Sequence, residues 1–374
     1  MSKPRVLYVG RTRYRVPLSE SLRRKFSALE RELDVRVLGS AQPDSQLTTH
    51  MFRLVPRRRP AVLDGALFYL TLPSLVAGEL RRFRPHAVIT QSVYEGAAVL
   101  LAKRLTRSDA RLIVDVHGDW DTATELYGSR KRRLLAPVTK RLSRLSVRRA
   151  DAVRTISEFT TRRVRQEGIE PAAVFPAYVD FTTFLERPPA HLPPRPRALF
   201  VGVLERYKNV DGLAAAWRRA VERMPDAQLL VVGSGSEQAT IERLIAELPR
   251  QTAWAPRFSS EEVARALDES TLLVLPSRSE GLPRIVIEAF CRGRPVVGTR
   301  SGGIPDIVED GVNGLLIPPE DPDALADALV RVFSDHELQE RLAEGALASA
   351  AEWLQTPEQY AAHVRELVGR VSGV

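Results

Sequence analysis

Short apolar runs alternate with amphipathic segments along almost the whole chain, and this alternation limits the fold more than any other feature of the sequence. Residues 271–319 show it most clearly. Thr271–Leu275 is a continuous apolar run, as expected of a buried parallel strand, and Arg284–Arg292 carries apolar residues at helical spacing. Pro283 suits the first turn of that helix, where its missing N–H is no loss. Strands joined by helical crossovers form a parallel sheet, so the chain is predicted to be an α/β protein.

A proline-rich stretch at residues 186–197 divides the alternation into two series. It holds five prolines and no periodicity, which is typical of a linker between domains. At 374 residues the chain is long enough for two full hydrophobic cores. We therefore predict two doubly wound parallel-sheet domains, 1–187 and 188–355. In the first, residues 42–60 are predicted to be irregular.

The single cysteine and the absence of long apolar segments predict a cytoplasmic protein. Cys291 alone cannot form an intramolecular disulfide or a cysteine-ligated zinc site, and it suits a reducing compartment. The apolar run near the N-terminus is far too short for a signal peptide. No apolar stretch is long enough to span a membrane.

Positive charge is concentrated in the first half of the chain. Residues 1–190 hold 35 Lys and Arg against 19 Asp and Glu, a net charge of +16, whereas the rest carries −7. Residues 130–149 contain no acid and have leucines at helical spacing. This basic helix either binds an anionic membrane surface or packs its apolar stripe on the sheet with its basic face in solvent. Nucleic acid is a poorer partner, because the few aromatic residues are not interleaved with the basic ones. The nine basic residues are Arg130, Lys131, Arg132, Arg133, Lys140, Arg141, Arg144, Arg148 and Arg149.

Charged side chains gather where predicted strands of the second series end. Glu280 lies in the loop after the strand at 271–275, and Glu288 lies in the next helix. Two carboxylates there suit hydrogen bonding to vicinal hydroxyls of a sugar or ribose. Arg206 and Lys208 follow another predicted strand, where fixed positive charge would stabilise a diphosphate leaving group. The alternative for each is a solvated surface charge. Ligands of α/β sheets bind outside the carboxyl ends of the strands, so these loops are predicted to face one crevice.

Glycine-containing loops follow several predicted strands and are candidates for binding anions. The G-x-G at 233–235 is too short for a dinucleotide fingerprint, so it is either a tight strand–helix turn or a phosphate cradle. The SGG at 301–303 leads into a helix predicted to start at Pro305, whose free N–H groups would attract an anion, and the alternative is a plain turn. No Walker-type G-x-x-x-x-G-K-[ST] motif is present, which excludes a P-loop nucleotide hydrolase.

The end of the predicted strand Leu112–Val116 carries two further candidates. His117 is either a catalytic or hydrogen-bonding group or a histidine satisfied by nearby backbone. Asp119-Trp120-Asp121 has the D-x-D spacing of a divalent-metal site. No G-x-S-x-G elbow is present and no motif surrounds the cysteine, so nucleophilic hydrolysis is unsupported.

These motifs resemble those of the retaining GT-B glycosyltransferases of the glycosyltransferase family 4 type. Fainter similarity extends over most of the chain except roughly residues 11–75. The resemblance implies two Rossmann-like domains with a cleft between them, the first completed by a C-terminal helix at about 356–374. The motifs that carry it are SRSEGLPRIVIEAF at 277–290, GRPVVGT at 293–299, SGGIPDIV at 301–308, NGLLIPP at 313–319, V-G-x-L-x-x-x-K-N at 201–209, VHGD at 116–119 and ADAVRTIS at 150–157.

The resemblance also implies roles for individual residues. Glu288 matches the carboxylate that holds the donor ribose, and Glu280 matches the one that contacts the hydroxyls of the transferred sugar. Lys208 matches the diphosphate-binding lysine, and His117 matches the histidine beside the sugar at the reaction centre. The further donor-binding candidates are Arg206, Gly202, Gly233, Gly281, Leu282 and Pro283.

Three departures from the family pattern affect these expectations. Val203 stands where the family usually has Arg, so Arg206 is the candidate replacement for one diphosphate cation. Pro283 replaces a common Gly and cannot donate an N–H. The N-terminal double-glycine loop is reduced to Gly10, which is followed by arginines and is predicted to end the strand Arg5–Val9. The candidates for binding the acceptor or a membrane are Gly10, Arg11, Arg13, Arg132, Arg133, Lys140 and Arg141.

We therefore predict a retaining, metal-independent glycosyltransferase whose donor is a nucleotide diphosphate sugar, with UDP or GDP as the nucleotide. The acceptor is predicted to be a glycan, a lipid-linked molecule or a small molecule. No cofactor is expected, and the predicted location is the cytoplasm, at the inner face of the membrane. The alternatives are a sugar-nucleotide epimerase or phosphorylase of the same fold, and a non-catalytic nucleotide-sugar binding module.

Overall fold

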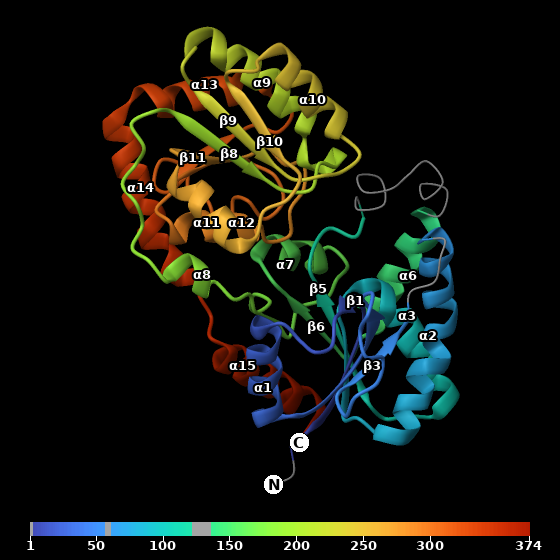
Figure 1. Ribbon diagram of the computed structural model, residues 1–374. Coiled ribbons are helices and arrows are strands. Elements are labelled where there is room, and N and C mark those ends of the chain that lie inside the picture. The colour runs from blue at the N-terminus through green and yellow to red at the C-terminus, as the bar shows by residue number, and fades with distance from the viewer. Residues whose placement is uncertain (1–2, 57–60, 122–135) are drawn as a thin grey trace. The chain divides into compact units, whose positions relative to one another are not determined.

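The computed structural model describes residues 3–56, 61–121 and 136–374, and these form two compact units (Figure 1). The first unit holds the described residues up to Val179 together with Gln355–Val374. The second holds Asp180–Leu354. Each unit has its own parallel sheet and its own hydrophobic core.

The first unit is built on a seven-stranded sheet in the order β3-β2-β1-β4-β5-β6-β7, and its strand pairs are parallel. The strands are β1 Arg5–Tyr14, β2 Asp34–Ala41, β3 Phe52–Val55, β4 Ala87–Thr90, β5 Arg111–Val116, β6 Ala152–Thr155 and β7 Ala173–Val174. The helices are α1 Glu20–Glu32, α2 Ala61–Phe83, α3 Val93–Thr106, α6 Ala136–Arg149, α7 Glu158–Arg165 and α15 Pro357–Ser372.

Helices cover both faces of this sheet, because successive residues of a strand point to opposite sides. Val6 and Tyr8 of β1 belong to the core formed with α1 and α15, whereas Leu7 and Val9 belong to the core formed with α2 and α3. Both faces are buried, which is why the strands are continuous apolar runs rather than alternating ones. The last helix of the chain, α15, packs beside α1.

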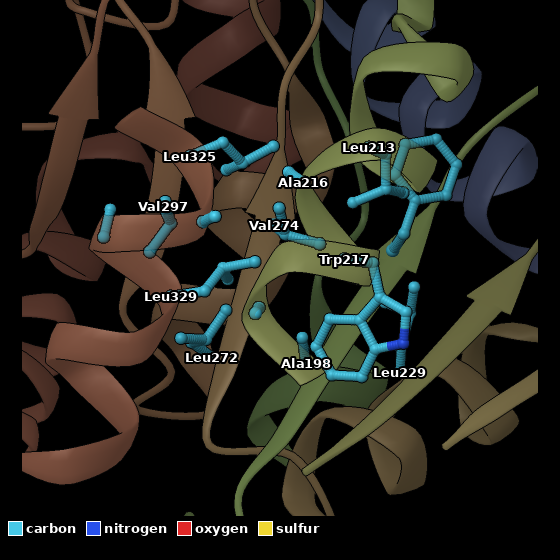
Figure 2. Packing of buried hydrophobic residues seen from close by; sticks show 14 of the residues in the cluster. Ala198, Leu213, Ala216, Trp217, Leu229, Leu272, Val274, Val297, Leu325 and Leu329 are labelled. Carbon is cyan, nitrogen blue, oxygen red and sulfur yellow. The ribbon is translucent and has the colours of Figure 1, made fainter. Parts of the chain in front are cut away.

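The second unit repeats this plan with a six-stranded sheet in the order β10-β9-β8-β11-β12-β13. Trp217 on α9 and Leu325 and Leu329 on α13 cover one face of the sheet, where they pack among strand residues such as Leu229 and Leu272 (Figure 2). The strands are β8 Arg197–Val201, β9 Gln228–Val232, β10 Thr252–Ala255, β11 Leu272–Leu275, β12 Val296–Thr299 and β13 Gly314–Ile317. The helices are α8 Thr182–Leu185, α9 Val210–Arg223, α10 Gln238–Glu247, α11 Ser260–Asp268, α12 Arg284–Cys291, α13 Pro322–Ser334 and α14 His336–Ala350, with 3-10 turns at Arg206–Lys208 and Ala351–Trp353.

The strand order of each sheet reverses once, between β1 and β4 in the first unit and between β8 and β11 in the second. These are doubly wound Rossmann-like sheets, so the predicted fold class is confirmed. At such a reversal the flanking loops leave the sheet in opposite directions and open a crevice outside the carboxyl ends of the strands, where ligands bind. The loops after β8 and β11 are therefore the natural place to look for a site in the second unit.

Two predictions about strands in the first unit were wrong. Residues 42–60 are not irregular throughout, because Phe52–Val55 pairs with β2 as β3, and Phe52 packs against the ring of Tyr14 at 5.3 Å. The first strand does not end at Gly10. It continues to Tyr14, with a register shift after Val9, because buried Tyr14 holds it against β2.

The helix predicted to start at Pro305 is also absent, and isolated turns take its place. The side chain of Asn313 accounts for this. Its Oδ1 accepts the N–H of Glu309 at 2.8 Å, and its Nδ2 donates to the carbonyl of Ile307 at 3.2 Å. These bonds satisfy backbone groups that a continuing helix would have paired internally.

The proline-rich stretch belongs to the second unit, so the division between the units falls at Val179/Asp180 and not at 187/188. Two buried arginines attach the stretch. Arg292 donates to the carbonyls of Arg187 and Pro188 at 2.6 and 2.9 Å, and Arg294 donates to the carbonyl of Ala190 at 2.8 Å. Proline-rich backbone offers many carbonyls and few N–H groups, which suits these guanidinium donors.

Candidate active site

A buried ion pair lies at the strand-order reversal of the second sheet. Lys208 ends the short turn after β8, Glu280 lies in the loop after β11, and Lys208 Nζ is 2.6 Å from Glu280 Oε1. Their side chains are only 10% and 12% exposed. The structure thus brings together two of the residues singled out in the sequence, 72 positions apart, at the crevice where an α/β sheet binds its ligands.

Two glycines shape the backbone beneath Lys208. A Cβ on Gly202 would lie 3.2 Å from Lys208 Cε, so the lysine stem runs close over the end of β8. A Cβ on Gly233, which has a φ of +150°, would lie 1.8 Å from the carbonyl oxygen of Gly202. Gly233 also donates its N–H to Ala255 and accepts from Trp254 Nε1 at 2.8 Å. Of the two interpretations of the G-x-G at 233–235, this geometry supports the tight turn. A role of Gly202 and Gly233 in donor binding stays a prediction.

Gly233→Ala is therefore expected to destabilise the second unit by about 1–3 kcal/mol, because an added methyl must push two backbones apart at a conformation that L-residues rarely adopt. Urea unfolding followed by circular dichroism measures this. The control is Gly78→Ala in α2, where a Cβ would meet no atom within 4 Å. Since alanine is the better helix former, that change should be neutral or stabilising. Equal stability of the two variants would contradict the close-approach argument.

Hydrogen bonds from the loop after β12 fix the loop that carries Glu280. Gly303 donates its N–H to the carbonyl of Glu280 at 2.9 Å, and Ser301 Oγ donates to the carbonyl of Arg278 at 2.5 Å. Gly302 has a φ of +58°, and a Cβ there would lie 2.4 Å from the carbonyl oxygen of Glu280. The SGG segment is thus a turn that packs beneath Glu280, and the geometry fits that interpretation rather than an anion site at a helix start.

Arg278 joins the two loops of this site, and the sequence reasoning missed it. Its N–H donates to the carbonyl of Tyr207 at 2.7 Å, and its guanidinium donates to the carbonyl of Arg206. The same guanidinium contacts Asp211 at 3.1 Å and Glu320. An arginine in a polar loop is normally solvated, so only the fold reveals that Arg278 holds the turn of Lys208 against the loop of Glu280.

The other donor-site candidates surround this pair. Glu288 is half-buried on α12; burial raises the pKa of its carboxyl, and the positive charge of Arg284 offsets part of that rise. Gly281 and Leu282 form the half-buried turn before α12, and buried Pro283 is its N-cap residue, with a φ of −76°. Arg206 is exposed, and its side chain forms no ion pair with any residue that the structure describes.

His117 follows β5 in the first unit, and a buried ion pair lies behind it. Its Nε2 is 3.8 Å from Asp115 Oδ2, and its side chain is 37% exposed. Asp115 and Arg154 form two hydrogen bonds of 2.8 Å, and Arg154 stacks 4.6 Å from the ring centre of Phe175. Burial acts to raise the pKa of Asp115, but Arg154 and His117 together lower it below its usual value. The sequence signal that could have predicted this pair is an acid in one apolar strand, β5, and a base in the next, β6.

The two aspartates of the D-x-D segment, which has the spacing of a metal site, bind an arginine. Asp119 Oδ1 and Asp121 Oδ2 lie 3.0 and 2.9 Å from Arg163 Nη2, and Arg144 also reaches Asp121 at 3.3 Å. Guanidinium groups therefore neutralise both carboxylates, which leaves a cation little to gain there. Within residues 3–56, 61–121 and 136–374, no group of three or more His, Cys, Asp or Glu is placed to hold a metal ion.

The N-terminal candidates are largely held by contacts within the first unit. Gly10 lies in β1, with Gln91 against it. Arg11 pairs with Asp64 at 3.1 Å and donates its N–H to buried Glu95 at 3.3 Å, while Arg13 is exposed. Burial raises the pKa of Glu95, although the hydroxyl of Ser92 and the N–H of Arg11 oppose that shift.

The four basic candidates of the 130–149 segment divide between two regions. Arg132 and Arg133 lie outside the described residues. Lys140 and Arg141 lie on α6, where Lys140 is half-buried and Arg141 is exposed. In the part of the chain that the structure describes, no helix is long and apolar enough to cross a membrane.

Two successive Rossmann-like units are the arrangement of the GT-B fold of glycosyltransferases, and solved structures share this fold. Sucrose-phosphate synthase from Thermosynechococcus elongatus matches with a TM-score of 0.79 at 20% identity, over 100% of both chains. Anabaena Alr3699/HepE in complex with UDP-glucose matches with a TM-score of 0.70 at 16% identity, over 99% of this chain and 100% of the other. At these identities the likeness concerns the fold.

Family models identify the two halves of the chain. Residues 21–182 match the Glycosyltransferase Family 4 model, and residues 183–348 match the Glycosyl transferases group 1 model. The chain thus consists of a family 4 domain followed by a group 1 glycosyltransferase domain. Alpha-D-kanosaminyltransferase from Streptomyces kanamyceticus is 30% identical over 228 residues, which are 57% of this chain and 59% of that protein. The chain therefore spans less than two thirds of that relative.

Proposed function

We propose that this glycosyltransferase moves a sugar from a nucleotide diphosphate sugar to an acceptor, with retention of configuration at the anomeric carbon. The observation that carries the proposal is the Lys208–Glu280 pair, 2.6 Å apart and largely buried at the carboxyl edge of the second sheet. A donor brings diphosphate oxygens for the lysine and sugar hydroxyls for the carboxylate. A donor that separates Lys208 from Glu280 therefore gives each of the two charged groups a new partner.

The donor-binding roles follow from what each group offers. Lys208 is a fixed cation for the leaving diphosphate, and free N–H groups at the start of α12 add partial positive charge. Glu280 accepts hydrogen bonds from the transferred sugar, and Glu288 accepts them from the ribose hydroxyls. The role of His117 beside the transferred sugar, which the resemblance implies, stays a prediction.

The proposed reaction needs no separate general base. The bond between the anomeric carbon and the diphosphate oxygen breaks, and the acceptor oxygen forms its bond to the same face of that carbon. The departing phosphate oxygen takes the acceptor proton. Because Lys208 and the α12 N-terminus supply fixed positive charge, we propose that the reaction is metal-independent and uses no cofactor.

The substrates and location are proposed more broadly. UDP or GDP is the proposed nucleotide, and the complex of the similar Anabaena protein with UDP-glucose supports UDP. The acceptor is a glycan, a lipid-linked molecule or a small molecule. Since Val203 offers no cation, exposed Arg206 is the proposed second phosphate ligand. We place the protein in the cytoplasm, at the inner face of the membrane.

Glu288→Gln is expected to weaken nucleotide-sugar binding by about tenfold, because a charge-assisted hydrogen bond to ribose becomes a neutral one. Calorimetry with a panel of UDP- and GDP-sugars measures this. The binding should also depend on pH. Since burial raises the pKa of Glu288, wild-type affinity should begin to fall at a higher pH than for an exposed glutamate as the pH is lowered, whereas the Gln variant should show no such fall.

The same panel tests the proposed reaction as a whole. Nuclear magnetic resonance of the product should show the donor's anomeric configuration, and activity should survive a chelator. An altered sugar nucleotide formed without an acceptor would indicate an epimerase, and phosphorolysis would indicate a phosphorylase. Binding without any turnover would indicate a non-catalytic module. Unchanged affinity in Glu288→Gln would contradict only the assignment of Glu288 to the ribose and would leave the proposed reaction standing.

A further inference from the structure

Helix α6 packs with its small residues inward and its leucines outward. Its buried residues are Ala136, Ser143, Ser146 and Val147. Ser146 lies so close to α3 that a Cβ on Gly96 would come within 2.6 Å of the serine Cβ. For Val138, Leu142 and Leu145, the described part of the leucine stripe, the interpretation that the stripe packs on the sheet is therefore wrong, because small residues make the contact instead.

Three neighbouring helices carry exposed aliphatic side chains. α3 contacts both α2 and α6, and the three cover the same face of the first sheet (Figure 1). In α6, Val138, Leu142 and Leu145 are 55%, 43% and 44% exposed and recur at helical spacing. Globular proteins rarely leave contiguous aliphatic groups in water unless the surface binds something. We name these side chains the outer aliphatic face: Leu70, Leu101, Leu105, Val138, Leu142 and Leu145.

Basic side chains lie among these aliphatic ones. α6 contains no acid and five basic residues. Arg144 and Arg148 pair with Glu167 at 3.0 and 2.9 Å, but Arg141 and Arg149 are exposed and form no ion pair with the residues that the structure describes. α3 adds Arg104 and Arg107 in its last turn and C-cap, whereas its Lys103 is paired with Asp151 at 3.0 Å.

We propose that the outer aliphatic face, with Arg141 and Arg149, docks the first unit on a bilayer containing anionic phospholipids. The aliphatic side chains would enter the boundary between headgroups and acyl chains, and the long arginine side chains would reach lipid phosphates. Flexible arginines around short aliphatic groups suit a fluid anionic surface better than the fixed charge pairs of an acidic protein partner. The net charge of +16 on residues 1–190 adds long-range attraction.

This inference rests on the membrane location in the proposed function and specifies the surface responsible. Flotation of the full chain with vesicles tests it without any need for turnover. We expect the protein to float at low salt with phosphatidylcholine vesicles that contain phosphatidylglycerol, to float less at high salt, and to stay behind with phosphatidylcholine alone.

Paired variants separate the two contributions. Arg141→Gln with Arg149→Gln should weaken vesicle binding by about fivefold per charge. Leu142→Ser with Leu145→Ser should weaken it by about tenfold or more, with the fold kept because both leucines are exposed. The matched control is Arg341→Gln with Leu347→Ser on α14, an exposed pair in the second unit that should leave vesicle binding unchanged.

Two outcomes would overturn the docking proposal. The wild type could fail to float with anionic vesicles at low salt, and retention on an acidic polypeptide resin would then indicate a protein partner. The α14 variant could lose as much binding as the α6 variants, which would make the attraction nonspecific. Glycosyl transfer to a water-soluble acceptor should be unaffected by Leu142→Ser with Leu145→Ser, so failure of docking is distinguishable from failure of the proposed reaction.

Discussion

Lys208→Met is expected to lower kcat by about 10²–10³-fold, the loss that follows when one preorganised charge is removed from a leaving group. Methionine keeps an unbranched stem over Gly202 but removes the ammonium group 2.6 Å from Glu280. In the proposed reaction the ammonium leaves Glu280 for the diphosphate, and its positive charge then stabilises the negative charge that develops on the leaving group. Steady-state kinetics on the preferred donor measures the loss.

The ion pair makes controls necessary, because loss of one partner leaves the other charge buried and uncompensated. Thermal unfolding of Lys208→Met should therefore show some loss of stability, and adding Glu280→Gln should recover much of it. Arg250→Ala removes an exposed cation of the same unit and should keep wild-type kinetics. A wild-type kcat in a folded Lys208→Met protein would contradict the proposal that Lys208 stabilises the diphosphate leaving group.

Asp115→Ala is expected to destabilise the first unit by about 3–5 kcal/mol. The change leaves Arg154 buried without its carboxylate, and a guanidinium cannot escape the cost by deprotonation. Asp115→Leu combined with Arg154→Met removes both charges and should recover most of the lost stability. Urea unfolding gives these values. If the single variant were as stable as the double one, the pair would not be coupled.

The pH dependence of this pair has a defined sign. Since the folded state lowers the pKa of Asp115, the carboxylate adds stability above its unfolded pKa of about 3.9. That stability should be lost as the pH falls through the lower, folded value. In the double variant this loss should be missing at acidic pH.

Much of the fold could be predicted from the sequence. Continuous apolar runs such as Thr271–Leu275 predict strands buried on both faces, and their alternation with helices allows little besides a doubly wound sheet. The placing of Glu280 and Lys208 was equally accessible. Each lies in the loop that follows a strand, and parallel strands bring their carboxyl ends to one edge.

Contacts between distant segments decided the rest. Asp119 and Asp121 have the spacing of a metal pair, but Arg163, on α7, supplies the positive charge. From the sequence, Arg278 is expected to be a solvated loop residue. In the structure it connects the loop of Glu280 to the turn of Lys208, because its guanidinium donates to the carbonyl of Arg206. These pairings depend on where separate loops meet in space, which local sequence patterns do not encode.

The sequence by itself determined that α6 is a basic amphipathic helix, because residue spacing sets which side chains share a helix face. Only the tertiary structure decided which face is buried. Ser143 and Ser146 let the helix approach α3 closely, and this packing directs Leu142 and Leu145 into solvent beside the arginines. Periodicity defines the faces of a helix, but its neighbours select the one that packs.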